Sequence, residues 1–248
     1  MRKTHIGIYV LLFLIFGCSV REEQGILRLV VKGKYADQPL IMGAEYPYFE
    51  GSKISFTKSE FFISEIAVKD QQGNWIELNP GNPKFVNLQN HHFNIENALA
   101  GLKISIGSLP PGDYTYIRMG IGLPASINNL QPKDFPSSST LGQGDHYWAG
   151  WNSFIFSKTE GIIKNAPQMA NFAYHSGFNE AYQMIEFNTD LKIIDETDSE
   201  IVMNMDHQRI FGNSTNFINI YQDPIIHEGG TFMDNFMNQL RSSIEILK

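Results

Sequence analysis

Cysteine is almost absent from this sequence, with Cys18 the only one among 248 residues. A single thiol excludes an internal disulfide framework, and it excludes zinc or iron–sulfur sites built from four cysteines. Runs of lysine and arginine are absent as well, and 19 basic against 26 acidic residues give a net charge of -7. Because nucleic-acid binding requires a basic surface that displaces counterions from phosphate, we do not expect this chain to bind nucleic acid.

The sequence also lacks internal repeats, low-complexity tracts and any Pro/Gly-rich linker long enough to separate two domains. Charged residues make up only 18% of the chain, whereas 42% are hydrophobic and 12% are aromatic. This balance excludes a disordered, collagen-like or coiled-coil chain. A chain of this length can bury a sizeable core, and an all-β sandwich of this size commonly forms one domain. We therefore predict a single folded domain over residues 26–248.

Catalytic signatures are missing too. The sequence contains no nucleophile elbow, no phosphate-binding glycine loop, no HExxH pair and no dinucleotide fingerprint, so we do not expect an enzyme. Composition leaves a glycoside hydrolase open, because its two carboxylates need only a suitable separation, which the sequence does not fix. The carboxylates nearest the aromatic segment described below are Asp134, Asp145, Glu160 and Glu180.

The N-terminus has the organisation of a bacterial export signal. Arg2 and Lys3 precede an apolar stretch of eleven residues, Ile6 to Phe16. That stretch is too short to cross a hydrocarbon core of about 30 Å as a helix, but it fits a signal peptide. It runs into Ile15-Phe16-Gly17-Cys18, which resembles a lipobox, with a small residue before the cysteine that receives the lipid. A signal peptide with an incidental cysteine is the alternative.

This organisation predicts a signal peptide over residues 1–17 and a tether over residues 18–25. Acyl chains on Cys18 would hold the chain to the membrane by burying methylene groups in lipid. We therefore expect a lipid-anchored protein of the bacterial cell envelope, on the periplasmic side or at the outer-membrane surface.

Short alternating segments broken by turn signals follow the tether, which is typical of β-strands. Strong turns are predicted at 70–74, which contains a glycine, and at 109–113, which contains Pro110, Pro111 and Gly112. The predicted strands are 26–31, 53–57, 61–69, 75–78, 102–106, 114–122, 154–158, 171–175, 183–188 and 201–206.

Only the C-terminus has a helical pattern. Thr231 and Asp234 have the spacing of a capping box. The apolar residues that follow recur every four positions and would lie on one helix face: Phe232, Phe236, Leu240 and Ile244. The expected fold is therefore all-β, a β-sandwich of about ten strands with one C-terminal α-helix as a lid.

Three segments and a short element carry a resemblance to a known family. They are residues 53–66 (KISFTKSEFFISEI), 111–124 (PGDYTYIRMGIGLP), 146–161 (HYWAGWNSFIFSKTEG) and 174–177 (YHSG). The tryptophan-rich third segment is the most specific. Together they resemble the MbnP-like copper-binding domain family, which is related to the CorA/MopE copper proteins. Two departures stand out: His146 replaces the usual methionine, and an extra residue separates the two tryptophans.

The resemblance implies a periplasmic or surface protein that binds copper. In some members of the family, a di-haem peroxidase-like partner oxidises one tryptophan to kynurenine, and the modified residue helps to bind the metal. By resemblance, Trp148 or Trp151 would be the aromatic wall or oxidation target here. A place in the core of the sandwich or at its edge is an equally good interpretation of both side chains.

The histidines inside the family-like segments are the first candidates for copper ligands. Copper(I) favours imidazole and soft sulfur at low coordination number, so His146 and His175 are predicted to share one ion. Met203, Met205 and His207 would share one face of a strand and form a weaker candidate site, although paired methionines more often fill core. His227 lies in a Glu-Gly-Gly loop and is interpreted mainly as part of that loop.

Two rival functions remain at this stage. A non-metal binding or adhesion lipoprotein would use exposed, coplanar Trp148 and Trp151 to contact a carbohydrate or a protein, with the histidines apart. A purely structural surface lipoprotein is the weaker rival. The copper hypothesis instead requires imidazole nitrogens about 4–5 Å apart, given metal–nitrogen bonds of about 2 Å.

Overall fold

A computed structural model describes residues 24–213 and 217–247 of the chain. The predicted signal peptide, Cys18 and the tether up to residue 23 lie outside the described residues. No helix within the described ranges combines the length and the apolar character needed to cross a bilayer.

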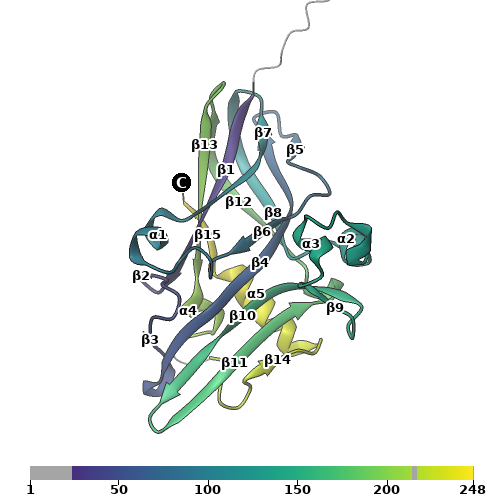
Figure 1. The fold of residues 1–248 in the computed structure, drawn as a ribbon. Helices are drawn as coiled ribbons and strands as arrows, with labels where there is room; N and C mark the ends of the chain where they lie inside the picture. The colour runs from purple at the N-terminus through teal and green to yellow at the C-terminus, as the bar shows by residue number, and fades with distance from the viewer. Residues whose placement is uncertain (1–23, 214–216, 248) are drawn as a thin grey trace, which may run out of the picture.

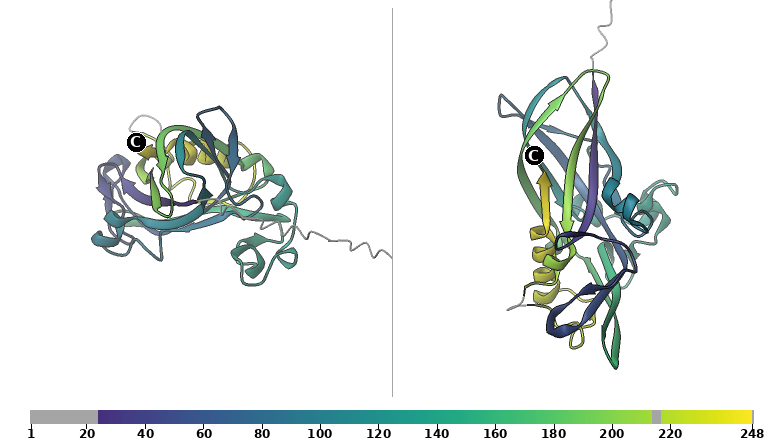
Figure 2. Two further views of the ribbon diagram at one scale, coloured as in Figure 1. Left: turned by 90° about the horizontal axis from the view of Figure 1, so that it is seen from above. Right: turned by 90° about the vertical axis from the view of Figure 1, so that its left-hand side faces the viewer.

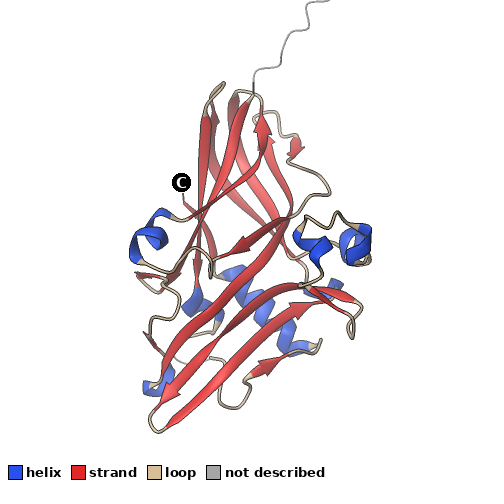
Figure 3. Cartoon of the chain, in the orientation of Figure 1, coloured by secondary structure: helices blue, strands red, loops and turns tan. Residues whose placement is uncertain are grey.

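Strands dominate the molecule, and they form two sheets that share one hydrophobic core (Figures 1 and 3). The smaller sheet contains β1 (Gly25–Tyr35), β2 (Gln38–Pro39), β7 (Leu102–Leu109), β13 (Asp198–Asp206) and β15 (Ile244–Leu247). The larger sheet contains β3 (Tyr46–Pro47), β4 (Lys53–Asp70), β5 (Trp75–Glu77), β6 (Lys84–Asn87), β8 (Gly112–Ile121), β9 (Tyr147–Trp148), β10 (Ser153–Asn165), β11 (Gln168–Gly177), β12 (Gln183–Ile193) and β14 (Ile225–Ile226). The predicted all-β sandwich is confirmed.

The helices are short, apart from the last. They are α1 (Ile95–Ala100), α2 (Ala125–Asn128), α3 (Thr140–Gln143), α4 (His207–Ile210) and α5 (Thr231–Ser242), with 3-10 turns at Phe49–Gly51, Pro132–Asp134 and Asn179–Ala181. The predicted C-terminal helix is therefore present, but Gly230 is its N-cap rather than Thr231. Figure 2 shows α5 leading directly into β15, so Ile244 belongs to a strand and not to the helix.

The long strand β4 runs through the centre of the larger sheet, whose order is β12-β8-β4-β10-β11-β14. The sequence predicted two strands here, because residues 58–60 interrupt the apolar alternation. The chain instead continues as one strand, and an irregularity between Ser64 and Ala67 absorbs the extra residue Glu65, whose φ is +46°. Such bulges add a residue and increase local twist without ending the strand. β4 carries Lys58 and Glu60, two of the charged side chains described below.

In the smaller sheet, the first strand lies between strands from distant parts of the chain. β1 pairs in parallel with β13 and antiparallel with β7. Leu27, Leu29 and Val31 of β1 alternate toward the interior and are fully buried. The β-branched-rich stretch at residues 26–31 predicted this strand, but the partners of the strand could not be read from that stretch.

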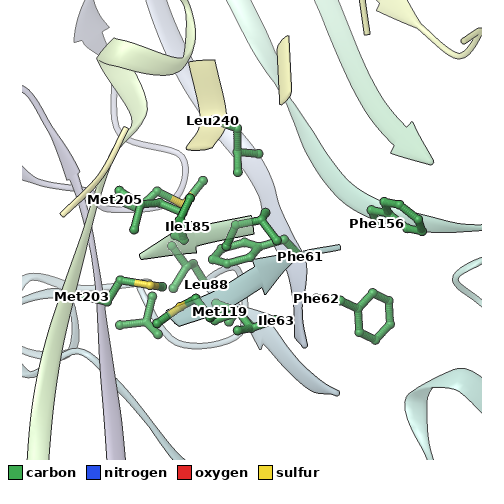
Figure 4. Packing of buried hydrophobic residues seen from close by; sticks show 14 of the residues in the cluster. Phe61, Phe62, Ile63, Leu88, Met119, Phe156, Ile185, Met203, Met205 and Leu240 are labelled. Atoms are coloured by element: carbon green, nitrogen blue, oxygen red, sulfur yellow. The ribbon is translucent and has the colours of Figure 1, made fainter. Parts of the chain in front are cut away.

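Aromatic side chains and methionines fill the space between the sheets, together with the buried face of α5. Figure 4 shows Met203 and Met205 of β13 among the apolar residues of this core, which also contains Met119 of β8. From the helix, Phe236 and Leu240 are each 1% exposed. Burying side chains of this size contributes about 1.5–3 kcal/mol each. The core therefore fixes the sheet on which the candidate site is built.

A buried asparagine fastens α2 to the start of β10. Asn128 is 3% exposed, and its Oδ1 accepts hydrogen bonds from the Phe154 backbone N at 2.9 Å and from Ser153 Oγ at 3.1 Å. Its Nδ2 donates to Asn179 Oδ1 at 2.9 Å. Ser153 Oγ in turn accepts from the Phe178 backbone N at 3.0 Å. This network holds the β9–β10 hairpin against the end of β11.

Replacing Asn128 with alanine is expected to destabilise the protein by about 1–3 kcal/mol, because the buried N–H of Phe154 loses its acceptor. Chemical denaturation at pH 7 measures the change. Asn179→Ala leaves the Asn128 acceptor in place and removes only the partner of its Nδ2, so its effect should be smaller. An Asn128→Ala variant as stable as wild type would mean that the network does not hold the hairpin.

Candidate functional site

Two imidazole rings from distant parts of the chain meet at the end of β11. Tyr174 of β11 pairs in parallel with Ile226 of β14. The next residues, His175 within β11 and His227 just after β14, therefore lie side by side. Their rings stack with centroids 4.6 Å apart and planes inclined by 23°. The strands β11 and β14 are neighbours in Figure 1, and their pairing is what brings these histidines together.

Each ring of this imidazole pair keeps one buried nitrogen without a hydrogen bond. Nε2 of His175 lies 2.8 Å from Glu160 Oε1, whereas its Nδ1 is buried and has no partner among the described residues. Nε2 of His227 is likewise buried without a partner in that part of the chain. A neutral imidazole carries one N–H and one lone pair, and an unpaired buried nitrogen is costly. These two atoms are therefore the chemically open positions of the site.

A tryptophan side chain closes one side of the pair. The Trp148 ring contacts His227 at 5.0 Å and His175 at 6.4 Å between centroids, in both cases edge to face. Its other neighbour is Trp151, stacked at 4.8 Å with planes 12° apart. Trp151 in turn packs on Phe178 at 5.0 Å. The short β9–β10 hairpin thus places Trp148 beside the imidazoles and Trp151 on the far side of Trp148.

Four charged side chains next to the imidazole pair form two ion pairs between neighbouring positions of β4 and β10. Glu60 pairs in register with Lys158, and Lys58 pairs with Glu160. Lys58 Nζ lies 3.2 Å from Glu160 Oε1, and Lys158 Nζ lies 3.5 Å from Glu60 Oε1. We call these four residues the charge quartet. The carboxylate Glu160 joins the quartet to His175, so the imidazole pair stands at one end of it.

For both His175 and Glu160, burial and the hydrogen bond between them shift the pKa in opposite directions. Burial lowers the pKa of His175, although the hydrogen bond with Glu160 works against this. Burial by itself would raise the pKa of the Glu160 carboxyl, but the hydrogen bond with His175 and the charge of Lys58 hold that pKa below its usual value. At neutral pH the site therefore presents a neutral imidazole beside an ionised carboxylate. Neutral imidazole is the form that binds metal.

His146 lies at the opposite end of the charge quartet. Its Nε2 is 3.0 Å from Glu60 Oε1, and its ring packs edge to face against Phe85 at 4.6 Å and Phe62 at 5.5 Å. Its Nδ1 is buried and unpartnered among the described residues. In the sheet, β10 separates the Glu60 position from the strand that carries His175. That His146 and His175 share one ion stays a prediction. The imidazole ring that His175 contacts in the structure is that of His227.

A comparison with known protein families shows which family this chain belongs to. The model of the MbnP family matches residues 24–228. The chain belongs to the MbnP family. Among solved structures, MbnP from Methylosinus trichosporium is similar to this chain at 10% sequence identity, with a TM-score of 0.54 over 84% of this chain and 82% of that one. At this identity the likeness shows the fold alone. No curated protein matches the chain.

The imidazole pair, both tryptophans and the charge quartet all fall inside the range matched by the MbnP family model, whereas α5 lies beyond it. The site is therefore part of the MbnP domain itself. The weaker candidate site also lies within this range, but in different surroundings.

Met203 and Met205 are 0% and 1% exposed, and both thioethers lie in the core (Figure 4). The strand ends at Asp206, as predicted, and His207 begins α4, so His207 does not share the strand face of the two methionines. The His207 ring is hydrogen-bonded through both nitrogens, Nε2 with Ser59 Oγ at 2.8 Å and Nδ1 with the Met205 carbonyl at 3.2 Å. This packing favours a structural role for all three side chains.

His227 is the site residue that sequence reasoning missed in this member of the MbnP family. The sequence places it before Glu228-Gly229-Gly230, which indicates a loop. The two-residue strand β14 that precedes it is too short for periodicity to identify. In the sequence, only the β-branched pair Ile225-Ile226 indicates that a strand precedes His227. Its partner could not be deduced, because the pairing with β11 spans about fifty residues of sequence.

Proposed function

We propose that this MbnP-family chain is an extracytoplasmic copper-binding protein that takes part in copper handling, with Nδ1 of His175 and Nε2 of His227 as its ligating atoms. The observation that carries the proposal is the stacked imidazole pair, each ring with a buried nitrogen that lacks a hydrogen-bond partner among the described residues. A bound copper ion would supply the partner that these nitrogens lack. Copper is here the cargo that the protein holds, and no catalytic role is proposed.

The donor set fits copper(I) in particular. Copper(I) accepts few ligands and prefers soft or imidazole donors, whereas zinc sites in proteins hold three or four protein ligands. Magnesium and calcium require oxygen ligands. The nearest carboxylate, Glu160, is already engaged by His175 and Lys58. The electron-rich face of Trp148 beside both rings further suits a soft cation.

Trp148 is the tryptophan that we place next to the metal, because it contacts both imidazoles, whereas Trp151 contacts Trp148 and Phe178. Oxidation of one of these rings by a di-haem peroxidase-like partner remains a prediction from the family resemblance. Attachment to the cell envelope through lipid on Cys18 is likewise part of the proposal, supported by the export signal in the sequence.

The rival adhesion function calls for a flat aromatic platform with the histidines apart. Trp148 and Trp151 are instead stacked on one another and partly buried, and two histidines meet beside them. For the glycosidase alternative, Glu160 is committed to Lys58 and His175, and Asp134 accepts the Gln131 backbone N–H at 2.9 Å. These arrangements favour metal binding over both rivals.

Copper(I) titration of the purified mature domain tests the proposal. With ascorbate present and a chromophoric copper(I) chelator as competitor, we expect one equivalent to bind tightly and to quench tryptophan fluorescence, because Trp148 contacts both ligands. Magnesium(II) should produce neither effect. A chain that fails to withdraw copper(I) from the chelator would contradict the proposed function.

A further inference from the structure

Glu160 occupies a position between the imidazole pair and the charge quartet. Its Oε1 lies 2.8 Å from Nε2 of His175 and 3.2 Å from Nζ of Lys58. The side chains of Lys58 and Glu160 are only 29% and 26% exposed, and that of His175 is 12% exposed. Adjacent strands fix all three: Lys58 on β4 is in register with Glu160 on β10, and His175 lies on β11 beyond it.

This arrangement decides which nitrogen of His175 carries the proton. A carboxylate is an acceptor only, so the Nε2 that faces Glu160 must donate an N–H. A neutral imidazole then has its lone pair on Nδ1. Nδ1 is the buried nitrogen that has no hydrogen-bond partner among the described residues. Without Glu160, no acceptor holds the proton on Nε2, and a proton on Nδ1 would occupy the lone pair that the metal requires.

We propose that Glu160, held in place by Lys58, is a positioning residue of the copper site that fixes the His175 tautomer and leaves Nδ1 free to bind the metal. The inference rests on the proposed function for its consequence, but the tautomer itself is a property of the metal-free protein. Hydrogen-bonded carboxylates that orient metal-ligating histidines typically change metal affinity by about 10–100-fold when they are removed.

The chain offers a matched control at the other end of the quartet. Glu60 bears the same relation to His146 that Glu160 bears to His175, with a 3.0 Å hydrogen bond and a neighbouring lysine. Both glutamates are partly or fully buried and lie on the same sheet. Glu60→Ala therefore makes the same change in a similar environment without removing a contact of the imidazole pair.

The test is the ¹⁵N NMR tautomer of His175 in the metal-free protein, combined with copper(I) affinity. Wild type is expected to show protonated Nε2. In Glu160→Ala, we expect a tautomer mixture and about 10–100-fold weaker copper(I) binding. Glu160→Gln retains an acceptor oxygen, so it should keep the wild-type tautomer and most of the affinity. Glu60→Ala should leave both His175 readouts unchanged, and circular dichroism establishes that each variant is folded.

The outcomes separate the two proposals. A wild-type tautomer and unchanged affinity in folded Glu160→Ala would overturn the positioning role, even if the native chain binds copper. An equal loss of affinity in Glu60→Ala would also overturn it, because the loss would then come from removing any carboxylate of the charge quartet. A tautomer change in Glu160→Ala in a protein whose wild type fails to bind copper(I) would keep the assignment of the proton and reject the copper function instead.

Discussion

Glutamine in place of His227 is expected to weaken copper(I) binding by at least about 100-fold, or about 2.7 kcal/mol. The variant removes one of two imidazoles whose rings stand 4.6 Å apart, and the remaining ring cannot hold the ion alone with comparable affinity. His175→Gln should produce a loss of similar size for the same reason. Competition with a copper(I) chelator measures both variants, under the conditions used for the wild-type titration.

His146→Gln is the control that distinguishes the structural site from the one expected on sequence grounds. His146 packs against Phe62 and Phe85 and bonds to Glu60, so its replacement should leave copper(I) affinity near the wild-type value. If His146→Gln loses binding while His227→Gln retains it, the imidazole pair is not the site. The His175 variant alone cannot decide, because both hypotheses include that ring.

Acid is expected to destabilise the protein well before its carboxylates are protonated. Burial lowers the pKa of His92 to about 4, with a contribution from His91, and burial likewise lowers that of His207 to about 4, with a contribution from His92. Each buried ring uses one nitrogen as an acceptor: Nε2 of His92 accepts the Gly33 N–H at 3.1 Å, and Nε2 of His207 accepts the Ser59 hydroxyl at 2.8 Å. Protonation would break these bonds.

The direction of the pH effect follows from the two protonation states. Between pH 6.5 and about 4 the unfolded chain binds protons at these histidines and the folded chain does not, so the free energy of unfolding falls as pH falls. Each ring accounts for about 3 kcal/mol over this window, and below it the loss from these rings stops. The pKa values of Glu60 and Glu160 are lowered from 4.5, so their stabilisation is lost only at lower pH.

Chemical denaturation between pH 7 and pH 4 measures this loss directly. His207→Gln and His92→Gln should each be less stable than wild type at pH 7 but should show a shallower pH dependence. Imidazole proton shifts give an independent check, since the resonances of these two rings should stay constant down to about pH 5. A wild-type stability that is flat over this range would show that neither ring is held neutral by burial.

The sequence was informative wherever period-2 alternation extended over five or more residues. It located β1, β8, β11, β12 and β13, although β1 continues to residue 35 and β12 to residue 193, four and five residues beyond their predicted ends. It split β4 at residues 58–60, because Lys58 and Glu60 are polar at positions that a sheet normally buries. Those charges are tolerated since each meets an opposite charge on β10. Pairing across strands, which single-strand patterns do not contain, explains the discrepancy.

Part of the candidate site was predicted from the sequence, and the part that was not depends on pairing between strands. His175, Trp148 and Trp151 lie in segments that resemble family motifs, and all three are at the site. His227 could not be assigned, because its role depends on the two-residue contact between β14 and β11. His146 was favoured because it adjoins the tryptophans in sequence, but the β9–β10 hairpin turns its ring toward Phe85 on β6. Proximity along the chain was a poor guide to proximity in space.

The parallel pairing of β1 with β13 has a consequence for how the chain reaches its native state. Arg28 and Asp198, 170 positions apart, form an ion pair at 2.9 Å across these strands. Contacts of such separation are slow to form, because a long loop must close before they provide any stabilisation. A nascent or truncated chain that stops before residue 198 would leave one edge of its first strand open to other chains. Such intermediates are prone to aggregate, so the first strand to be made is among the last to be protected.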